Sequence, residues 1–352
     1  MISEDAMKEY DIRALKRVRL MGRYDRFEPG FRMVHSGACA EMRVKGSRLD
    51  MEIEAAHDDR RHYISFVVDG LIAQTFAPIP GRHVYTVFLD MNPQKTHDML
   101  IIKETMDYEG MSFVTLHRLF TDGSFMPLRK REMRIEFIGD SVTAGEGLRG
   151  PKKFCEWIPM VYGALEGLSY VTAQKLHACY NTVAISGWGL HNGWNNDRAH
   201  SIPAIYDRIG LSVNKPYPFD FDPDAIVIEL GENDKCSMSQ PPFTDENNIS
   251  FRMTDDETGR KLVYDSALNF ICHLHRVNPR ARMLWIMLST SGMVHDMVSR
   301  AVETAASEGI DIRFDEPVDL NHMPRGGMGS RRHPGPLTHK IIAGRIAKLL
   351  KQ

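Results

Sequence analysis

The hydrophobic and polar positions of this chain follow two patterns, which change near residue 126. Before that point apolar and polar residues alternate, as in Glu41–Lys45 and Leu49–Glu54. A period of two predicts half-buried strands, because successive side chains of a strand point to opposite faces. The dipeptide Asp69-Gly70 between two apolar runs predicts a hairpin turn. Further strands are expected over His83–Leu89, Met99–Thr105 and Phe113–Phe120. Short strands at regular spacing indicate an all-β sandwich of the jelly-roll type.

The later part of the chain alternates between strands and helices. Four continuous apolar runs are typical of strands that are covered on both faces, as in a parallel sheet. They are Ile135–Ile138, Thr182–Ile185, Ala225–Leu230 and Met283–Leu288. Helical periodicity is found over Leu262–Val277, Met293–Ala306 and Leu337–Leu350. This alternation predicts an α/β domain in which helices flank a parallel sheet.

The length of the chain supports a division into two domains. Its 352 residues exceed what one hydrophobic core usually organises. We expect an N-terminal β-sandwich domain over residues 1–128 and an α/β domain over residues 129–352. The basic run Arg129–Arg131 lies at this boundary, and we interpret it as a solvated linker in preference to a phosphate site.

Charge and composition narrow the range of partners. Lys and Arg number 44 against 46 Asp and Glu, so the formal net charge of −2 gives no reason to expect nucleic acid or an anionic membrane. No apolar run approaches the ~20 residues of a membrane helix. The first twenty residues lack the apolar stretch of a secretion signal, so we expect a soluble, cytoplasmic protein. Five scattered cysteines without a C-x-x-C pair predict free thiols and no structural zinc site.

Ser141 is the first candidate for chemistry. It follows the strand Ile135–Ile138 directly, at the carboxyl edge of the sheet, where open α/β folds bind their ligands. Three other motifs fit this loop poorly. The spacing Gly145-x-Gly147-x-x-Gly150 starts too far from the strand for a dinucleotide site, and no Gly-Lys-Ser/Thr closes a phosphate loop. Thr143 stands where a G-x-S-x-G elbow needs its second glycine.

Three later segments place polar residues at the same edge of the sheet. Ser186–Gly189 follows the second predicted strand, Gly231–Asp234 follows the third, and His333 precedes the last predicted helix. Taken in order, these segments resemble the four blocks of the SGNH (GDSL-type) hydrolases: Gly139-Asp140-Ser141, Gly187, Gly231-x-Asn233-Asp234 and His333.

The all-β part adds a second resemblance. From Arg23 and Phe31 to the entry Arg134–Ser141, it is similar to carbohydrate esterase family 2. Members of that family join a jelly-roll domain to an SGNH domain, and they remove acetyl groups from xylan, mannan and related polysaccharides. The two resemblances together cover nearly the whole chain.

The resemblance implies roles for individual residues. Ser141 is expected to be the nucleophile and His333 the base that accepts its proton. The backbone amides of Ser141 and Gly187 and the side-chain amide of Asn233 are the expected oxyanion hole. Gly189 is the alternative to Gly187, because the second block can be aligned in two ways.

One position departs from the family. SGNH enzymes usually carry an aspartate three residues before the histidine, and here Ser330 stands three residues before His333. We prefer a Ser–His dyad in which a backbone carbonyl holds the imidazole, as the resemblance implies for some members. The alternatives are a carboxylate from Asp315, Glu316 or Asp319, or a weakened site.

Tryptophans are the candidates for contact with a sugar. Trp188 and Trp194 follow the second block among polar residues, whereas Trp285 lies inside an apolar run and is expected in the core. Asp140 and Asp234 are expected to brace the active-site loops by hydrogen bonds.

The sequence therefore predicts a carbohydrate O-acetyl esterase that acts on xylan- or mannan-type oligosaccharides through a serine acyl-enzyme. No metal or organic cofactor and no nucleic-acid or membrane partner is expected, and a homo-oligomer is compatible with the sequence. The alternatives are an SGNH lipase or thioesterase, or a carbohydrate-binding protein with a weakened site. Which acetyl position is preferred does not follow from the sequence.

Overall fold

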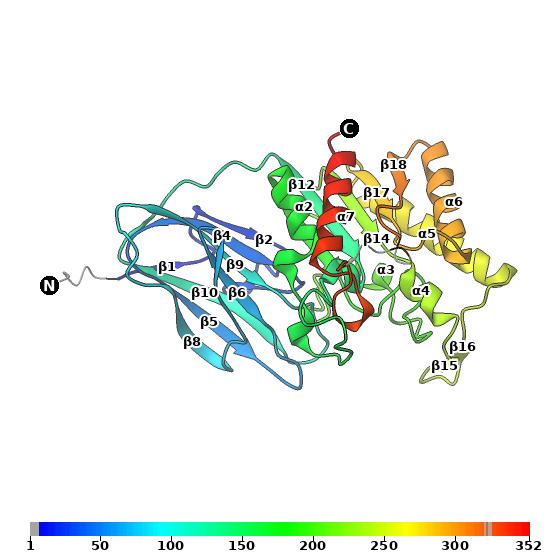
Figure 1. Cartoon of the computed structure of the whole chain (residues 1–352), viewed down its shortest axis with the longest axis horizontal. Helices are drawn as coiled ribbons and strands as arrows, with labels where there is room; N and C mark the ends of the chain where they lie inside the picture. The colour runs from blue at the N-terminus through cyan, green and yellow to red at the C-terminus, as the bar shows by residue number, and fades with distance from the viewer. Residues whose placement is uncertain (1–6, 320–321, 323–325) are drawn as a thin grey trace.

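The computed structural model describes residues 7–319, 322 and 326–352. An antiparallel β-sandwich is followed by an α/β unit with a central parallel sheet, and the two lie side by side (Figure 1). The predicted fold class is confirmed.

Two antiparallel sheets form the sandwich. The first has the order β1-β10-β5-β8, with β3 paired to β10, and the second has the order β11-β4-β9-β6-β7, with β2 paired to β4. The strands of the first are β1 (Lys8–Asp11), β3 (Phe31–Arg32), β5 (Leu49–Ala56), β8 (Gly81–Phe88) and β10 (Phe113–Thr121). Those of the second are β2 (Val18–Met21), β4 (Cys39–Lys45), β6 (Ile64–Val68), β7 (Leu71–Phe76), β9 (Thr96–Lys103) and β11 (Ser124–Phe125).

The predicted hairpin joins β6 to β7. Its turn residues, Asp69 and Gly70, both have positive φ angles, which a glycine adopts without strain. The strands β1 and β2 lie before the point at which the alternating pattern becomes clear, near Arg23, and they were not predicted.

The α/β unit is built on a parallel sheet in the order β13-β12-β14-β17-β18. Its strands are β12 (Met133–Gly139), β13 (Ala178–Ala184), β14 (Ala225–Glu229), β17 (Arg282–Ile286) and β18 (Ile312–Asp315). Four of the five are the predicted apolar runs. The short strand β18 was not predicted.

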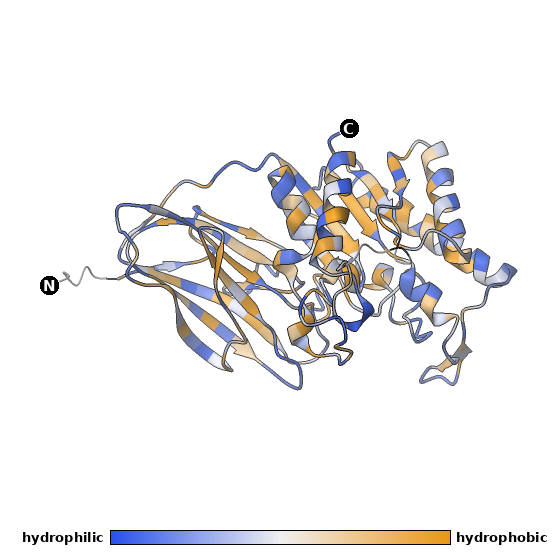
Figure 2. Cartoon of the chain, viewed as in Figure 1, coloured by the Kyte–Doolittle hydropathy of each residue, from blue (hydrophilic) through white to orange (hydrophobic). Residues whose placement is uncertain are grey.

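Helices cover both faces of this sheet (Figure 1). One face carries α2 (Leu168–Leu176) and α7 (Pro336–Leu349), and the other carries α5 (Glu257–Val277) and α6 (Met293–Ser307). The sheet strands are hydrophobic along their length, whereas the helices turn hydrophilic faces outward (Figure 2). Shorter elements are α1 (Ser141–Ala144), α3 (Ile202–Ile205), α4 (Glu232–Ser237), β15 (Phe243–Thr244) and β16 (Ser250–Phe251).

The order of the strands determines where a site can form. Numbered along the chain, the parallel strands lie in the order 2-1-3-4-5, so the direction of winding reverses between β12 and β14. Ligands of open α/β folds bind at this switch point, beyond the carboxyl ends of the strands. Ser141 follows β12 and Asn233 follows β14, so both lie there.

The sandwich and the α/β unit share a buried interface. Met21 and Ile102 of the sandwich belong to the same apolar cluster as Ile135 of β12. The Ser36 hydroxyl donates to the carbonyl of Ala144 at 2.7 Å, which ties the sandwich to the end of α1. The division at residues 128 and 129 therefore stays a prediction, because the two parts bury residues against each other.

The basic run at this junction corrects one interpretation. Arg131 is not solvated: its side chain is 8% exposed and binds both carboxylate oxygens of Glu41, at 2.8 and 3.0 Å. Arg129 pairs with Asp98 at 2.7 Å but is 73% exposed, and Lys130 is 82% exposed. The interpretation as a solvated segment therefore holds for Arg129 and Lys130, whereas Arg131 is a largely buried contact with the sandwich.

Some predicted absences can be compared with the described residues. Within them, no helix is long and apolar enough to cross a membrane. No group of three or more His, Cys, Asp or Glu side chains is arranged to hold a metal ion in the part of the chain that the structure describes. All five cysteines are free thiols.

Candidate active site

Ser141 is the first residue of the short helix α1. Asp140 caps this helix by accepting a hydrogen bond from the amide of Val142 at 3.1 Å. The serine is 8% exposed, and its Oγ lies 2.9 Å from Nε2 of His333. The structure therefore joins a hydroxyl and an imidazole that are 192 residues apart in the sequence.

A backbone carbonyl orients the imidazole of His333. Its Nδ1 lies 2.9 Å from the carbonyl oxygen of Arg331, so Nδ1 carries the hydrogen and Nε2 is left to accept from Ser141. Ser330 occupies the usual aspartate position, but its hydroxyl donates to the carbonyl of Arg149 at 2.7 Å. This arrangement is a Ser–His pair held by a carbonyl.

The three alternative carboxylates have other partners. Asp315 pairs with Arg345, Glu316 with His295, and Asp319 with His322. The structure therefore gives none of them the place of the missing aspartate beside His333.

An unusual backbone conformation brings the Arg331 carbonyl to the imidazole. Arg331 and Arg332 both have positive φ angles, in the left-handed region that side chains disfavour. Gly147, in the loop after Ser141 (the predicted nucleophile loop, residues 139–147), lies against this turn, and a Cβ placed on it would be 2.4 Å from Cβ of His333. Only glycine leaves room for the histidine loop at this distance.

Glu146 is a site residue that the sequence analysis did not single out. Its side chain is fully buried, and one carboxylate oxygen lies 3.9 Å from Nδ1 of His333. It pairs with Arg331 and accepts hydrogen bonds from Tyr162, at 3.1 Å, and from Ser186. Burial would raise the pKa of Glu146, but the neighbouring His333, the Ser186 hydroxyl and Arg331 outweigh it and lower the pKa. The carboxylate is therefore charged. The sequence signal that could have identified Glu146 is its place between Gly145 and Gly147, directly after the Ser141 block.

The second loop offers Gly187 as an amide donor. The amide of Ser186 donates to the sulfur of Met106 at 3.2 Å, and that of Gly189 donates to the carbonyl of His200 at 3.2 Å. Both neighbouring amides are thus engaged within the protein, which favours Gly187 over Gly189 for an oxyanion. The φ of Gly187 is positive, and a Cβ there would lie 2.9 Å from the ring of Trp194.

Asn233 lies at the site with both of its amide hydrogens in use. Its Nδ2 donates to Oδ2 of Asp140 and to the carbonyl of Trp188, each at 2.9 Å. To contact an oxyanion, this amide would have to share or release one of these bonds. Its oxyanion role stays a prediction.

Three buried carboxyl groups, those of Asp140, Glu229 and Asp234, accept hydrogen bonds from residues of the active-site loops. Burial raises the pKa of Asp140 to about 7, and burial together with the charge of Asp140 raises the pKa of Glu229 well above its usual value. Asp234 accepts from the amides of Leu190 and His191, both at 2.7 Å, and burial raises its pKa to about 6. Asp140 and Asp234 thus brace the loops, as expected.

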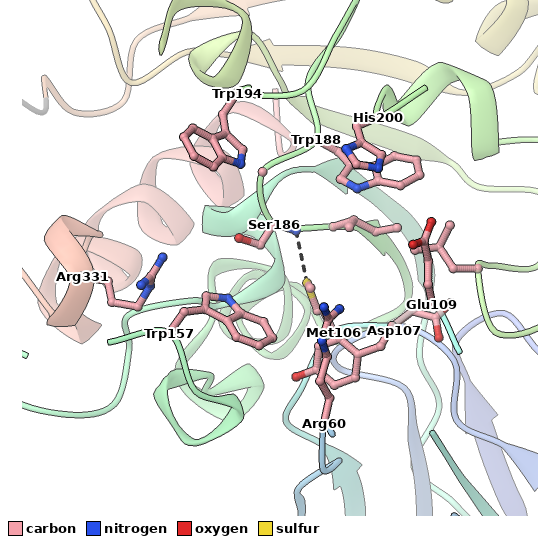
Figure 3. A pocket seen from close by; sticks show the side chains of 14 residues that line it. Arg60, Met106, Asp107, Glu109, Trp157, Ser186, Trp188, Trp194, His200 and Arg331 are labelled. Carbon is pink, nitrogen blue, oxygen red and sulfur yellow. Dashed lines mark hydrogen bonds between the residues drawn. The ribbon is translucent and has the colours of Figure 1, made fainter. Parts of the chain in front are cut away.

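Two cavities meet beside Ser141. One of about 460 Å³ contains Ser141, Gly187, Asn233 and His333, so all four predicted positions line one space. The second, of about 470 Å³, adjoins it and shares several of its lining residues (Figure 3). The shared residues are Ser186, Gly187, Trp194 and Arg331.

The second cavity lies between the sandwich and the α/β unit. The sandwich contributes Arg60 and the segment Met106–Glu109, and the α/β unit contributes Trp157, which was not predicted. The guanidinium of Arg60 lies 5.4 Å from the centre of the Trp157 ring. These residues make an aromatic wall with charged groups at its rim (Figure 3).

The predicted tryptophans differ in exposure. Trp194 is 50% exposed and borders both cavities, whereas Trp188 is 8% exposed and stacks on His200 with ring centres 5.0 Å apart. Trp194 is thus the more available of the two, and Trp188 supports the wall. Trp285 is fully buried, which confirms its place in the core.

Comparison with known proteins finds similarity to carbohydrate esterases. The sequence model described as the N-terminal part of carbohydrate esterase 2 matches residues 20–127. The chain is 29% identical to "Acetylxylan esterase / glucomannan deacetylase" of Cellvibrio japonicus over 326 residues, which cover 89% of this chain and 83% of that protein.

Two further similarities extend over almost the whole chain. "Cellulase/esterase CelE" of Acetivibrio thermocellus is 26% identical over 345 residues, or 94% of this chain, which spans only 39% of that longer protein. Among solved structures, the acetyl xylan esterase Est2A of the rumen bacterium Butyrivibrio proteoclasticus has a TM-score of 0.93 at 23% identity, with 98% of each chain covered.

Proposed function

We propose that this chain, an SGNH hydrolase that resembles carbohydrate esterase family 2, is an esterase that removes acetyl groups from xylan- or mannan-type oligosaccharides. One observation carries the proposal: Ser141 Oγ lies 2.9 Å from His333 Nε2, in a cavity that adjoins an aromatic-walled cleft. A hydroxyl within hydrogen-bond reach of an oriented imidazole is the arrangement of serine nucleophiles.

The reaction follows from the hydrogen bonds of His333. Nε2 takes the proton of Ser141 as Oγ attacks the acetyl carbonyl, and it then protonates the departing sugar oxygen. The acetyl group remains on Ser141 until water, deprotonated by the same nitrogen, releases acetate. Throughout these steps Nδ1 donates to the Arg331 carbonyl, which stabilises the positive imidazole.

The negative charge on the tetrahedral intermediate needs donors close to Ser141. The amides of Ser141 and Gly187 supply two of them, and Asn233 supplies a third by sharing a hydrogen that it now gives to Asp140 or to Trp188. Removal of one such donor typically lowers the rate by ~10²–10³.

The second cavity provides room for the sugar. Its volume of about 470 Å³ lies within the range of small-ligand sites, and aromatic rings with a polar rim suit a pyranose, which has apolar faces and hydroxyl edges. Trp194 borders both cavities, so a sugar ring stacked on it presents its ester to Ser141.

Replacement of the nucleophile tests this function. Ser141→Ala should abolish acetate release from p-nitrophenyl acetate and from acetylated xylo- and manno-oligosaccharides, while thermal unfolding stays close to that of the native chain. Ser307→Ala, at the exposed end of α6, is the matched control and should retain full activity. NMR of the oligosaccharides shows which acetyl positions disappear.

Other results would point to the alternatives. Unchanged turnover in Ser141→Ala contradicts the proposal, and a preference for long-chain p-nitrophenyl esters over acetate indicates a lipase or thioesterase. Sugar binding without acetate release indicates a weakened carbohydrate-binding protein. The cytoplasmic location stays a prediction, which the recovery of the native protein from culture supernatant would contradict.

A further inference from the structure

We propose that Glu146 is a positioning residue for His333: its buried carboxylate holds the Arg331 carbonyl against the imidazole and lies beside the charge that the imidazole acquires. This inference rests on the proposed function, since it assigns His333 the role of base. Glu146 comes from the nucleophile loop, between Gly145 and Gly147, and its side chain is fully buried.

The first part of the argument is mechanical. The Arg331 side chain pairs with Glu146 through Nε and donates to the carbonyl of Cys155 at 2.9 Å, and its backbone amide donates to the carbonyl of Phe154 at 2.7 Å. These contacts hold Arg331 in a left-handed conformation that costs energy in a residue with a side chain. That conformation directs its carbonyl to Nδ1 of His333.

The second part is electrostatic. The Glu146 carboxylate lies 3.9 Å from Nδ1 of His333, and it is fully buried, where water screens charges weakly. When His333 takes the proton of Ser141, the imidazole becomes positive on the side that faces this carboxylate. Glu146 thus supplies from the nucleophile loop the negative charge that Ser330 cannot supply.

Asp140 titrates between pH 4 and 9, because burial raises its pKa to about 7, and it lies 3.4 Å from the Ser141 hydroxyl. Two phenols and a second imidazole beside the pair do not. Burial raises the pKa values of the phenols of Tyr162 and Tyr108, which face Glu146 from the neighbouring loop and from the sandwich. Burial lowers the pKa of His339, near His333 at the start of α7, to about 3. Because the substitutions leave Asp140 and its hydrogen-bond partners in place, a difference in the pH profile between the variants reports on Glu146 and His333, and the NMR midpoint identifies His333.

The same carboxylate also contacts the loop that contains Gly187, the proposed donor to the oxyanion. The hydroxyl of Ser186 donates to Glu146, and Gly187 is the next residue along the chain. The loops that contain Glu146, Ser186 and Arg331 thus meet at one buried carboxylate. Loss of this group should therefore affect turnover more than substrate binding.

The experiment compares Glu146→Gln and Glu146→Asp with Glu104→Gln. Glu104 is a matched control because it is also fully buried, pairs with an arginine of similar exposure (Arg149 at 26%, Arg331 at 25%) and accepts from a serine hydroxyl. Its partners are Arg149, Ser65 and the amide of Leu165. Each variant is assayed on p-nitrophenyl acetate from pH 4 to 9, and the imidazoles are titrated by NMR of ¹⁵N-histidine-labelled protein, with His333→Ala to assign the signal.

We expect Glu146→Gln to lower kcat by about 10- to 100-fold with little change in KM, less than the ~10⁴-fold loss that follows neutralisation of a directly bonded triad aspartate. The acid limb of its pH profile and the NMR midpoint of His333 should move to lower pH, because the positive imidazole has lost a neighbouring negative charge. Glu146→Asp keeps the charge and should restore both midpoints, even where its shorter side chain lowers kcat. Glu104→Gln should lower stability alone.

An NMR midpoint in Glu146→Gln that equals the native value overturns the inference, as does a loss of kcat matched by Glu104→Gln. If Glu146→Gln does not fold, Glu146→Asp decides the question, because an acid limb displaced despite the retained charge contradicts it. A native protein without activity on p-nitrophenyl acetate would instead contradict the proposed function, and the NMR midpoints would still test the contact between Glu146 and His333.

Discussion

Gly147→Ala is the substitution whose effect can best be worked out from the structure. The added Cβ would lie 2.4 Å from Cβ of His333 and 2.7 Å from the carbonyl of Ser330, whereas ordinary contact begins near 3.4 Å. The histidine must therefore move by about 1 Å, and a displacement of that size in a catalytic group costs roughly 10²-fold in rate. We expect kcat/KM on p-nitrophenyl acetate to fall about 100-fold, which corresponds to about 2.7 kcal/mol.

Gly150→Ala is the matched control for this prediction. Gly150 and Gly147 both have positive φ angles, so both variants incur the ~1–2 kcal/mol cost of a left-handed alanine. The nearest atom to a Cβ on Gly150 is Cβ of Ser330 at 3.5 Å, an ordinary contact. Both variants should unfold at lower temperature, but Gly150→Ala should keep kcat/KM within about threefold of the native value. Equal activity of the two variants would refute the reasoning.

Three further predictions concern substrate binding and pH. Trp194→Ala should raise KM for acetylated oligosaccharides by about tenfold, a loss of ~1.4 kcal/mol, and leave kcat/KM on p-nitrophenyl acetate nearly unchanged. Burial lowers the pKa of His339 to about 3, so its contribution to the free energy of unfolding is complete above pH 6.5 and is lost as the pH falls toward 3. In urea unfolding, His339→Gln should therefore lose less unfolding free energy on acidification than the native chain. Burial raises the pKa of Asp140 to about 7, so its contribution is complete below about pH 4 and is lost as the pH rises through 7; Asp140→Asn should flatten the decrease of the unfolding free energy between pH 4 and 8.

Periodicity was sufficient to predict most of the fold. The continuous apolar runs became central parallel strands, because a strand buried on both faces needs apolar residues at every position. Elements that are short or partly exposed did not show this signal. The short strand β18 has one buried residue, and α2 has a weakly amphipathic sequence in which polar and apolar residues are mixed.

The candidate site could be predicted only where the residues form a local motif. Ser141, Gly187, Asn233 and His333 each stand in a short recognisable block, and the structure places them around one cavity. Trp157 and the sandwich segment Met106–Glu109 carry no such motif, and they reach the cleft only because the two parts of the chain pack together. Their contribution depends on tertiary contacts that local spacing does not encode.

The sequence did not determine which group orients His333, although it showed that Ser330 replaces the usual aspartate. Because Ser330 stands at the aspartate position, we expected a backbone carbonyl to orient the imidazole. No sequence pattern indicated which carbonyl this is, or which residues hold it in place. The carbonyl is that of Arg331, and its left-handed conformation depends on a glycine and a glutamate in the nucleophile loop, which is far from Arg331 in the sequence. An aspartate that orients a histidine is lost when that one residue is mutated. A backbone carbonyl remains whichever side chain its residue carries. The sensitivity to mutation should therefore lie in Gly147 and Glu146, which shape and support the turn, and not in a third member of a triad.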